Sequence, residues 1–213
     1  MINDHNVGSL VEAGLKNIRS ITVRDRNSSE IVKHYTGKNV PIVCDPVLLY
    51  GFPEQVNDSE FKSSQSHRYC VVYSYDSNMN DDVTIKAIRD YSSKHKLSVY
   101  SVGFFHKWCD RNIELSPLDV FKWFANADMV FTDTFHGSVI SLVSGAQFIA
   151  KIRGNANKLA FLLEQYGVSG RKVEDFGIIK EIIAKPIDYS EVNKRILDIR
   201  KTSLNYLKNA INA

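Results

Sequence analysis

The chain has 213 residues, of which 44% are apolar and 24% are charged, and its formal net charge at pH 7 is +3. This composition is that of a globular protein long enough for one large or two small domains. The small positive charge gives no argument for nucleic-acid binding, and the absence of a run of 18 apolar residues argues against a transmembrane helix. The polar N-terminus and three scattered cysteines, Cys44, Cys70 and Cys109, indicate a cytosolic protein with reduced thiols and no metal site.

The first fifty residues carry two short apolar runs with a helical pattern between them. Strands are expected over 20–23 and 40–45. A capping pair, Asn27 and Glu30, predicts the start of the intervening helix, and Gly37 predicts its end.

The segment 51–68 is rich in polar residues and is the best candidate for a boundary. We therefore divide the chain into an N-terminal segment over 1–50, a polar connecting loop over 51–68 and a domain over 69–213.

Strands and helices alternate through the rest of the chain. Strands are expected over 69–75, 97–103, 128–132 and 147–152, and helices over 81–96, 116–127, 135–145, 155–167 and 190–212. Such alternation predicts a Rossmann-like α/β domain, in which a mainly parallel sheet carries helices on both faces. The central strands are expected to be 69–75, 97–103 and 128–132, because they are the most continuously apolar.

Ligands of open α/β sheets bind beyond the carboxyl ends of the strands. Four loops should lie there, over 74–80, 103–108, 132–138 and 153–157. Of these, the turn over 132–138 carries the most chemistry, because a histidine and a glycine stand where a strand gives way to a helix.

At this turn, the helix start offers unpaired N–H groups to an anion, and Gly137 allows a ligand to approach the backbone. Ser138 adds a hydroxyl donor, and Thr134 is one of three residues able to cap the helix. His136 can donate to an anion or transfer a proton near neutral pH. A histidine with no role beyond the surface or the packing is the alternative, which the residue types leave open.

Three weaker candidates lie outside this turn. Arg24 directly follows a predicted strand and is suited to capturing a carboxylate or phosphate, although a surface charge cluster with its neighbours is the simpler interpretation. Lys151 and Arg153 lie near the end of another strand and can face an anion, while Asn155 or Asn157 is expected to cap the next helix. Tyr75 and Asp76 lie in a loop at the same sheet edge and could face a cleft there, although this signal is weak.

Three stretches of the chain occur in the same order in a known family. They read SITVRDRNSSEIV…TGKNVPIVCDPVLL, LSPLDVFKWFANADMVFTDTFHGSVISLVSGAQFIA and NKLAFLLEQYGV, and the most specific element is the turn Asp-x-Phe-His-Gly. On these residues the chain resembles the polysaccharide pyruvyl transferase family over nearly its whole length.

The resemblance implies a fold similar to the C-terminal domain of a two-Rossmann-domain (GT-B-like) glycosyltransferase. It implies transfer of a carboxyethylidene ketal from phosphoenolpyruvate, the donor substrate, to a sugar of a polysaccharide precursor, without a cofactor or metal. Arg24 and His136 would be catalytic and contact phosphoenolpyruvate, with His136 as general acid to its methylene carbon. Substrate binding would involve Thr134, Phe135, Gly137, Ser138 and Asn157.

The chain departs from the family pattern in two places. Thr134 stands where many members carry Arg or Ser, which removes a cation from the turn. Only about twenty residues precede Arg24, so the chain resembles the C-terminal half of the family's enzymes. We expect the apolar side of helix 190–212, together with segment 1–18, to bind a partner, either an N-terminal domain or a second copy, and the isolated chain to have little activity.

Two alternatives remain open from the sequence. The chain can be a sugar-nucleotide or phosphosugar binding domain that does not pyruvylate, or a non-catalytic association module. Its expected location is the cytoplasm, with the inner membrane face as a peripheral site.

Overall fold

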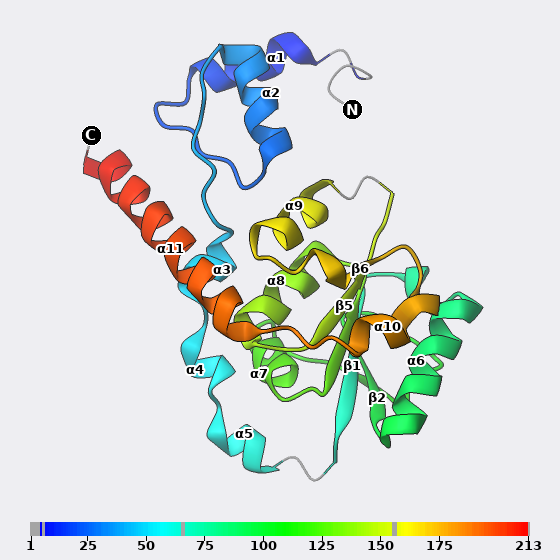
Figure 1. The fold of residues 1–213 in the computed structure, drawn as a ribbon. Helices are drawn as coiled ribbons and strands as arrows, with labels where there is room; N and C mark the ends of the chain where they lie inside the picture. Colours follow the sequence, from blue (N-terminus) through cyan, green and yellow to red (C-terminus); the bar gives the residue numbers. More distant parts are fainter. Residues whose placement is uncertain (1–4, 6, 65–66, 155–156, 213) are drawn as a thin grey trace.

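The computed structural model describes residue 5 and the ranges 7–64, 67–154 and 157–212. Within them lies one all-parallel sheet in the order β3-β2-β1-β4-β5-β6 (Figure 1). Its strands are β1 (Tyr69–Tyr73), β2 (Ser98–Val102), β3 (Arg111–Ile113), β4 (Met129–Thr132), β5 (Phe148–Lys151) and β6 (Lys172–Val173). The predicted Rossmann-like α/β arrangement is confirmed, with the three expected strands together at its centre.

The central strands are apolar throughout because both faces of the sheet are covered. All five residues of β1 are buried. Since successive side chains of a strand point to opposite faces, Val71 and Tyr73 enter one apolar core while Cys70 and Val72 enter the other. This explains why the strand shows a continuous apolar run and no alternation.

Helices cover the two faces unequally. The core that contains Cys70 and Val72 is closed by α6 (Asp82–His95) and α10 (Ile179–Ile183). The larger core on the other face is closed by α3 (Pro46–Tyr50), α7 (Asp119–Ala125), α8 (Phe135–Ser144), α9 (Asn157–Gln165) and the start of α11 (Tyr189–Asn212). Figure 1 shows α6 and α10 on one side of the sheet and α7 and α8 on the other.

Side-chain caps determine where several helices begin. Asp81 accepts a hydrogen bond from the backbone N–H of Thr84 at the start of α6. In α2 (Arg26–Thr36) the cap is Asp25, two residues before the predicted Asn27, while Gly37 ends the helix as expected. The helix α7 begins later than predicted, although the Ser116 hydroxyl still accepts from the N–H of Asp119.

The N-terminal segment is more irregular than predicted. It contains α1 (Gly8–Lys16), α2 and α3, and Figure 1 shows α1 and α2 at the top, apart from the sheet. The strands expected over 20–23 and 40–45 are reduced to a single parallel bridge between Val23 and Ile42. The pairing stops there because Pro41 has no N–H to donate to a ladder.

Several short elements have no clear sequence pattern. The expected loop over 51–68 contains α4 (Pro53–Val56) and α5 (Ser59–Ser64). The edge strands β3 and β6, the helix α10 and three 3₁₀ turns were not predicted; the turns are Ser77–Met79, Ser169–Arg171 and Phe176–Ile178. Elements this short present too few residues for a hydrophobic period to emerge.

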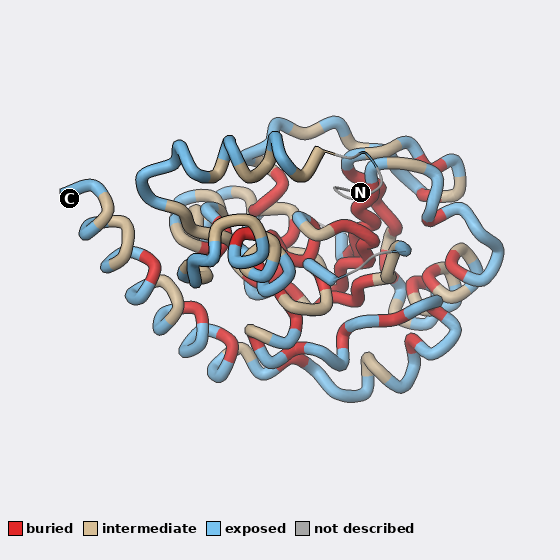
Figure 2. Tube along the Cα trace, turned by 90° about the horizontal axis from the view of Figure 1, so that it is seen from above, coloured by how far each residue is buried: buried red, intermediate tan, exposed pale blue. Residues whose placement is uncertain are grey.

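The long helix α11 has buried residues only as far as Ser203. Val192, Ile196 and Ser203 are buried, whereas Leu204 is 43% and Ile211 is 82% exposed. Figure 2 shows the C-terminal end of this helix extending away from the rest of the chain. None of the helices in the described ranges is long and apolar enough to cross a membrane.

The Ser203 hydroxyl is one of the groups that join α11 to the N-terminal segment, and we predict that its removal destabilises the protein. Ser203 Oγ accepts from the buried backbone N–H of Cys44 at 3.0 Å and donates to the Ile199 carbonyl. Ser203→Ala leaves that N–H without a partner, so the free energy of unfolding should fall by about 1–3 kcal/mol in urea titrations.

The matched control for this variant is Thr202→Ala. The Thr202 hydroxyl also donates to a carbonyl four residues earlier, but the residue is exposed and no N–H depends on it. This variant should stay within about 0.5 kcal/mol of the parent. Equal effects of the two substitutions would contradict the role assigned to Ser203.

Candidate active site at the carboxyl edge of the sheet

The turn between β4 and α8 is held by its own hydroxyl groups. Thr132 Oγ1 donates to the Tyr73 carbonyl of the neighbouring strand at 2.8 Å and accepts from the N–H of Thr134 at 3.1 Å. Thr134 Oγ1 in turn accepts from the N–H of Gly137 at 2.8 Å, which makes Thr134 the N-cap of α8. The turn is therefore a rigid part of the sheet edge.

Gly137 and Ser138 pack inside the turn between β4 and α8. A Cβ at Gly137 would lie 2.1 Å from Thr132 Oγ1, so the glycine is needed for the turn to close on itself, and no open space for a ligand lies at its Cα. The Ser138 side chain is buried and its hydroxyl lies 3.3 Å from the Thr134 carbonyl, to which it donates. Thr134, Gly137 and Ser138 thus shape the turn from inside.

His136 and Phe135 are the residues of the turn that reach outward. His136 is exposed and Phe135 is half-buried, while their neighbours on both sides are buried. Their backbone N–H groups belong to the first turn of α8 and have no hydrogen-bond acceptor among the described residues. An exposed imidazole and two free N–H groups therefore meet at the positive end of a helix.

Arg24 is brought to the same turn from the N-terminal segment. Its guanidinium carbon lies 5.6 Å from the centre of the Phe135 ring. One of its nitrogens pairs with the carboxylate of Asp45, which is buried and caps α3, while 44% of the arginine side chain remains exposed. Arg24, Asp25 and Arg26 do not form the surface charge cluster considered from the sequence, because Asp25 is buried as the cap of α2.

Beneath the turn lies a buried charge network. The carboxylate of Asp133 has a fully buried side chain, pairs with the Arg153 guanidinium and accepts from Asn78 Nδ2 at 2.9 Å. The other edge of the guanidinium binds both oxygens of Asp76 at 2.6 and 2.7 Å. These hydrogen bonds from Arg153 lower the pKa of Asp76.

The two cations at the end of β5, Lys151 as its last residue and Arg153 just after it, are thus paired with carboxylates of the chain. Lys151 Nζ lies 2.6 Å from Asp81 Oδ2 and also donates to Thr84 Oγ1. Burial alone would raise the pKa of Asp81, but hydrogen bonds from Lys151 and Thr84 lower it to about 2. The structure therefore pairs both cations with carboxylates of the chain, in place of the external anion considered from the sequence.

A buried histidine that the sequence did not single out borders this network. The indole of Trp108 donates to Asn80 Oδ1, which also lies 2.6 Å from His106 Nδ1. Since that oxygen only accepts, Nδ1 carries the hydrogen. Burial lowers the pKa of His106, and the carboxylates of Asp133 and Asp76 oppose this shift. His106 Nε2 and Asp133 Oδ1 are buried without a partner.

Asn157 lies in a different place from the histidine turn. It lines a pocket of about 230 Å³ between α2 and α9, together with Arg26 and Phe161, whose ring lies 5.5 Å from the Arg26 guanidinium carbon. Neither Arg24 nor His136 lines this pocket. The cap predicted at Asn155 falls outside the described residues.

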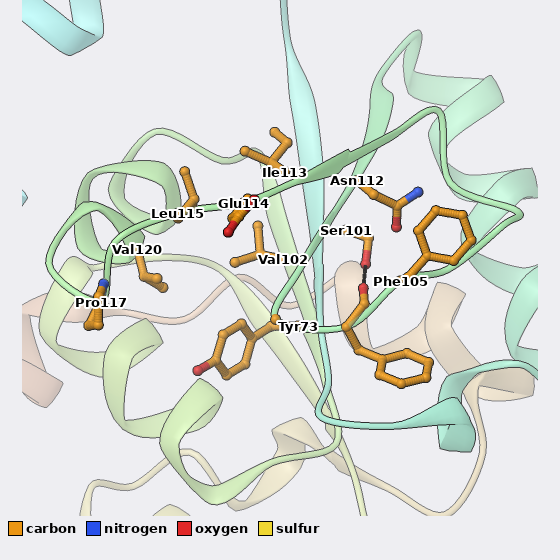
Figure 3. A pocket seen from close by; sticks show the side chains of 12 residues that line it. Tyr73, Ser101, Val102, Phe105, Asn112, Ile113, Glu114, Leu115, Pro117 and Val120 are labelled. Carbon is orange, nitrogen blue, oxygen red and sulfur yellow. Dashed lines mark hydrogen bonds between the residues drawn. The ribbon is translucent and has the colours of Figure 1, made fainter.

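A further pocket opens at the carboxyl ends of β1, β2 and β3. It has a volume of about 470 Å³ and is drawn in Figure 3. Apolar side chains dominate its lining, with Ser101, Asn112 and Glu114 as polar members. The loop over 103–108 is expected at this edge from the sequence. Its adjacent aromatic residues, Phe104 and Phe105, are a signal for a binding surface that the sequence analysis did not use.

Comparison with known proteins identifies the family of the chain. Residues 2–153 match the model of the family described as polysaccharide pyruvyl transferase, and this range includes Arg24 and the whole histidine turn. A search of curated proteins found no match. No cluster of three His, Cys, Asp or Glu residues able to hold a metal occurs in the described part of the chain.

The buried carboxylate of Asp133 should contribute most to the stability of this edge. Asp133→Asn replaces charge-assisted hydrogen bonds from Arg153 at a fully buried position, while Arg153 keeps Asp76 as a partner, so the free energy of unfolding in urea should fall by about 1.5–3 kcal/mol. Asp76→Asn is the control, because Asp76 binds the same guanidinium but its side chain is 50% exposed. That variant should lose no more than about 1 kcal/mol, and the reverse ranking would contradict this assignment.

His106 should make stability depend on pH. Because burial lowers its pKa below the ordinary 6.5, the unfolded chain binds the proton more readily than the folded one. The contribution of neutral His106 to the free energy of unfolding is therefore fully present above about pH 6.5, and it is lost as the pH falls toward the pKa of the folded state. Unfolding free energies measured between about pH 5 and pH 7.5 should fall on acidification less steeply in His106→Asn than in the parent.

The exposed His67 provides the control for this titration. His67→Asn should retain the parental pH dependence. An unchanged slope in His106→Asn would show that other groups cause the acid sensitivity.

Proposed function

Because the chain belongs to the polysaccharide pyruvyl transferase family, we propose that it binds phosphoenolpyruvate at the histidine turn and transfers its pyruvyl group to a sugar of a polysaccharide precursor. The observation that carries the proposal is the contact between Arg24 and Phe135, which joins a cation from the N-terminal segment to the start of α8.

The groups at this junction suit a donor with a carboxylate and a phosphate. The N–H groups of Phe135 and His136 lie at the positive end of α8, and Arg24 keeps part of its guanidinium exposed after pairing with Asp45. Thr134, Gly137 and Ser138 act from within, because they hold these N–H groups in position. The role proposed for these three residues is therefore to support the turn, in place of the direct substrate contacts expected from the sequence.

His136 then provides the proton that the chemistry requires. Protonation of the methylene carbon of phosphoenolpyruvate creates an oxocarbenium-like centre at the adjacent carbon, which a sugar hydroxyl attacks. Departure of inorganic phosphate then re-forms such a centre, and a second sugar hydroxyl attacks it to complete the ketal. Of the two hydroxyl protons released, one restores the proton of His136 and the other leaves with the phosphate. Arg24 and the helix start stabilise the negative charge that remains on the phosphate as it leaves.

Two variants separate binding from proton transfer. Arg24→Ala should weaken phosphoenolpyruvate binding, measured by calorimetry, by about tenfold or more, because a charge-assisted contact is lost. His136→Ala should lower kcat by about 10² to 10⁴ when transfer to a panel of methyl glycosides is followed by mass spectrometry, with a smaller effect on binding.

The controls are Arg68→Ala and His67→Ala. Both residues are exposed and adjoin the opposite end of β1, where Arg68 pairs with Asp128. They should leave donor binding and turnover unchanged. Donor affinity that neither Arg24→Ala nor His136→Ala alters would place the site elsewhere and refute the proposal.

A further inference from the structure

The 470 Å³ pocket beside the histidine turn is preformed. Its outer wall is the aromatic loop, residues 103–106, which follows β2. The Ser101 hydroxyl donates to the Phe104 carbonyl at 2.6 Å, a bond drawn in Figure 3. The Asn112 side chain accepts from the N–H of His106 at 2.7 Å and donates to its carbonyl at 3.1 Å. The aromatic loop is thus attached to both β2 and β3.

A close contact between backbone atoms determines the conformation of the aromatic loop at its start. Gly103 has a φ of +92°, and a Cβ there would lie 2.8 Å from the Ser74 carbonyl oxygen. The turn brings Phe105 to the surface, where it is 67% exposed. An aromatic ring held in water by a rigid loop is suited to packing against a ligand.

The polar groups of the pocket are those of a site for an uncharged ligand. Among the described residues that line it there is one carboxylate, Glu114, and no lysine or arginine. Glu114 has no hydrogen-bond or ion-pair partner in the described ranges. Burial raises the pKa of the Tyr73 hydroxyl, which therefore keeps its proton. Figure 3 shows Tyr73 and Glu114 around the same space.

Position links the pocket to the histidine turn. Tyr73 is the register partner of Thr132, so the pocket lies one strand away from the turn, a spacing of about 4.8 Å between strands. Both lie on the same face of the sheet, because the pocket is lined by Val120 of α7, and α7 is joined to α8 through the hydrogen bond from Ser144 Oγ to the Phe121 carbonyl.

We propose that this pocket binds a sugar ring of the acceptor, an inference that rests on the proposed function. Aromatic faces pack against the apolar side of a pyranose, while the Glu114 carboxylate accepts hydrogen bonds from its hydroxyls. A phosphate or carboxylate ligand is disfavoured, since it would meet Glu114 without a compensating cation. The pocket volume falls within the range of about 300–1,000 Å³ that is usual for small-molecule sites.

Saturation-transfer NMR with the methyl glycosides of glucose, galactose and mannose tests this site on the full chain. At least one glycoside should bind. Glu114→Gln should weaken it about tenfold, because a charge-assisted hydrogen bond becomes a neutral one, and Phe105→Ala about fivefold or more. Glu174→Gln and Leu197→Ala, which change an exposed carboxylate and an exposed apolar side chain outside the pocket, should leave glycoside binding unchanged.

Calorimetry with phosphoenolpyruvate on the same proteins distinguishes the two proposals. Donor affinity should change less than about twofold in Glu114→Gln, because the donor occupies the histidine turn. Absence of glycoside binding, glycoside binding that ignores both pocket variants, or tighter phosphoenolpyruvate binding in Glu114→Gln would overturn the sugar site. Pocket-dependent glycoside binding without any donor binding would retain the sugar site and refute the proposed donor site.

Discussion

The carboxyl edge of the sheet depends on the pairing of Arg153 with Asp133. A buried carboxylate is costly unless a cation and hydrogen-bond donors meet it, and Asp133 has both in Arg153 and Asn78. The same guanidinium holds Asp76 in the loop after β1. One ion network therefore ties together the loops that follow β1, β4 and β5, and the histidine turn is built directly on it.

Because this ion network supports the histidine turn, the turn can present a small number of reactive groups. Inside the turn, the hydroxyls of Thr132 and Thr134 form hydrogen bonds with backbone groups, and Gly137 leaves space for these side chains. Outside, His136 and the first N–H groups of α8 remain available. Rigid supports of this kind favour binding and catalysis, because little conformational freedom is lost when the ligand arrives.

The N-terminal segment contributes its cation through a second set of supports. Asp45 caps α3 and pairs with Arg24, and the N–H of the adjoining Cys44 donates to Ser203 of α11. Asp25 and Asp45, the two aspartates that flank this part of the segment, are both helix caps. Arg24, which lies between the histidine turn and these caps, keeps 44% of its side chain exposed.

Local pattern alone determined the succession of strands and helices, the central strands and the position of a histidine at a strand-to-helix junction. These features follow from periodicity and from capping residues, which act over a few neighbours. The short elements β3, β6 and α10 carry no such pattern and become ordered only by packing against longer neighbours.

Tertiary structure alone decided which charged groups face solvent and which neutralise one another. Lys151 and Arg153 resemble anion-binding cations in the sequence, but their carboxylate partners Asp81 and Asp76 lie about seventy residues away or more. The convergence of Arg24 on Phe135 and the pocket beside β2 and β3 also depend on segments that are distant along the chain. The energy of an ion pair depends on the distance between its two charges and on their burial. Both quantities are determined only when the folded sheet brings its loops together.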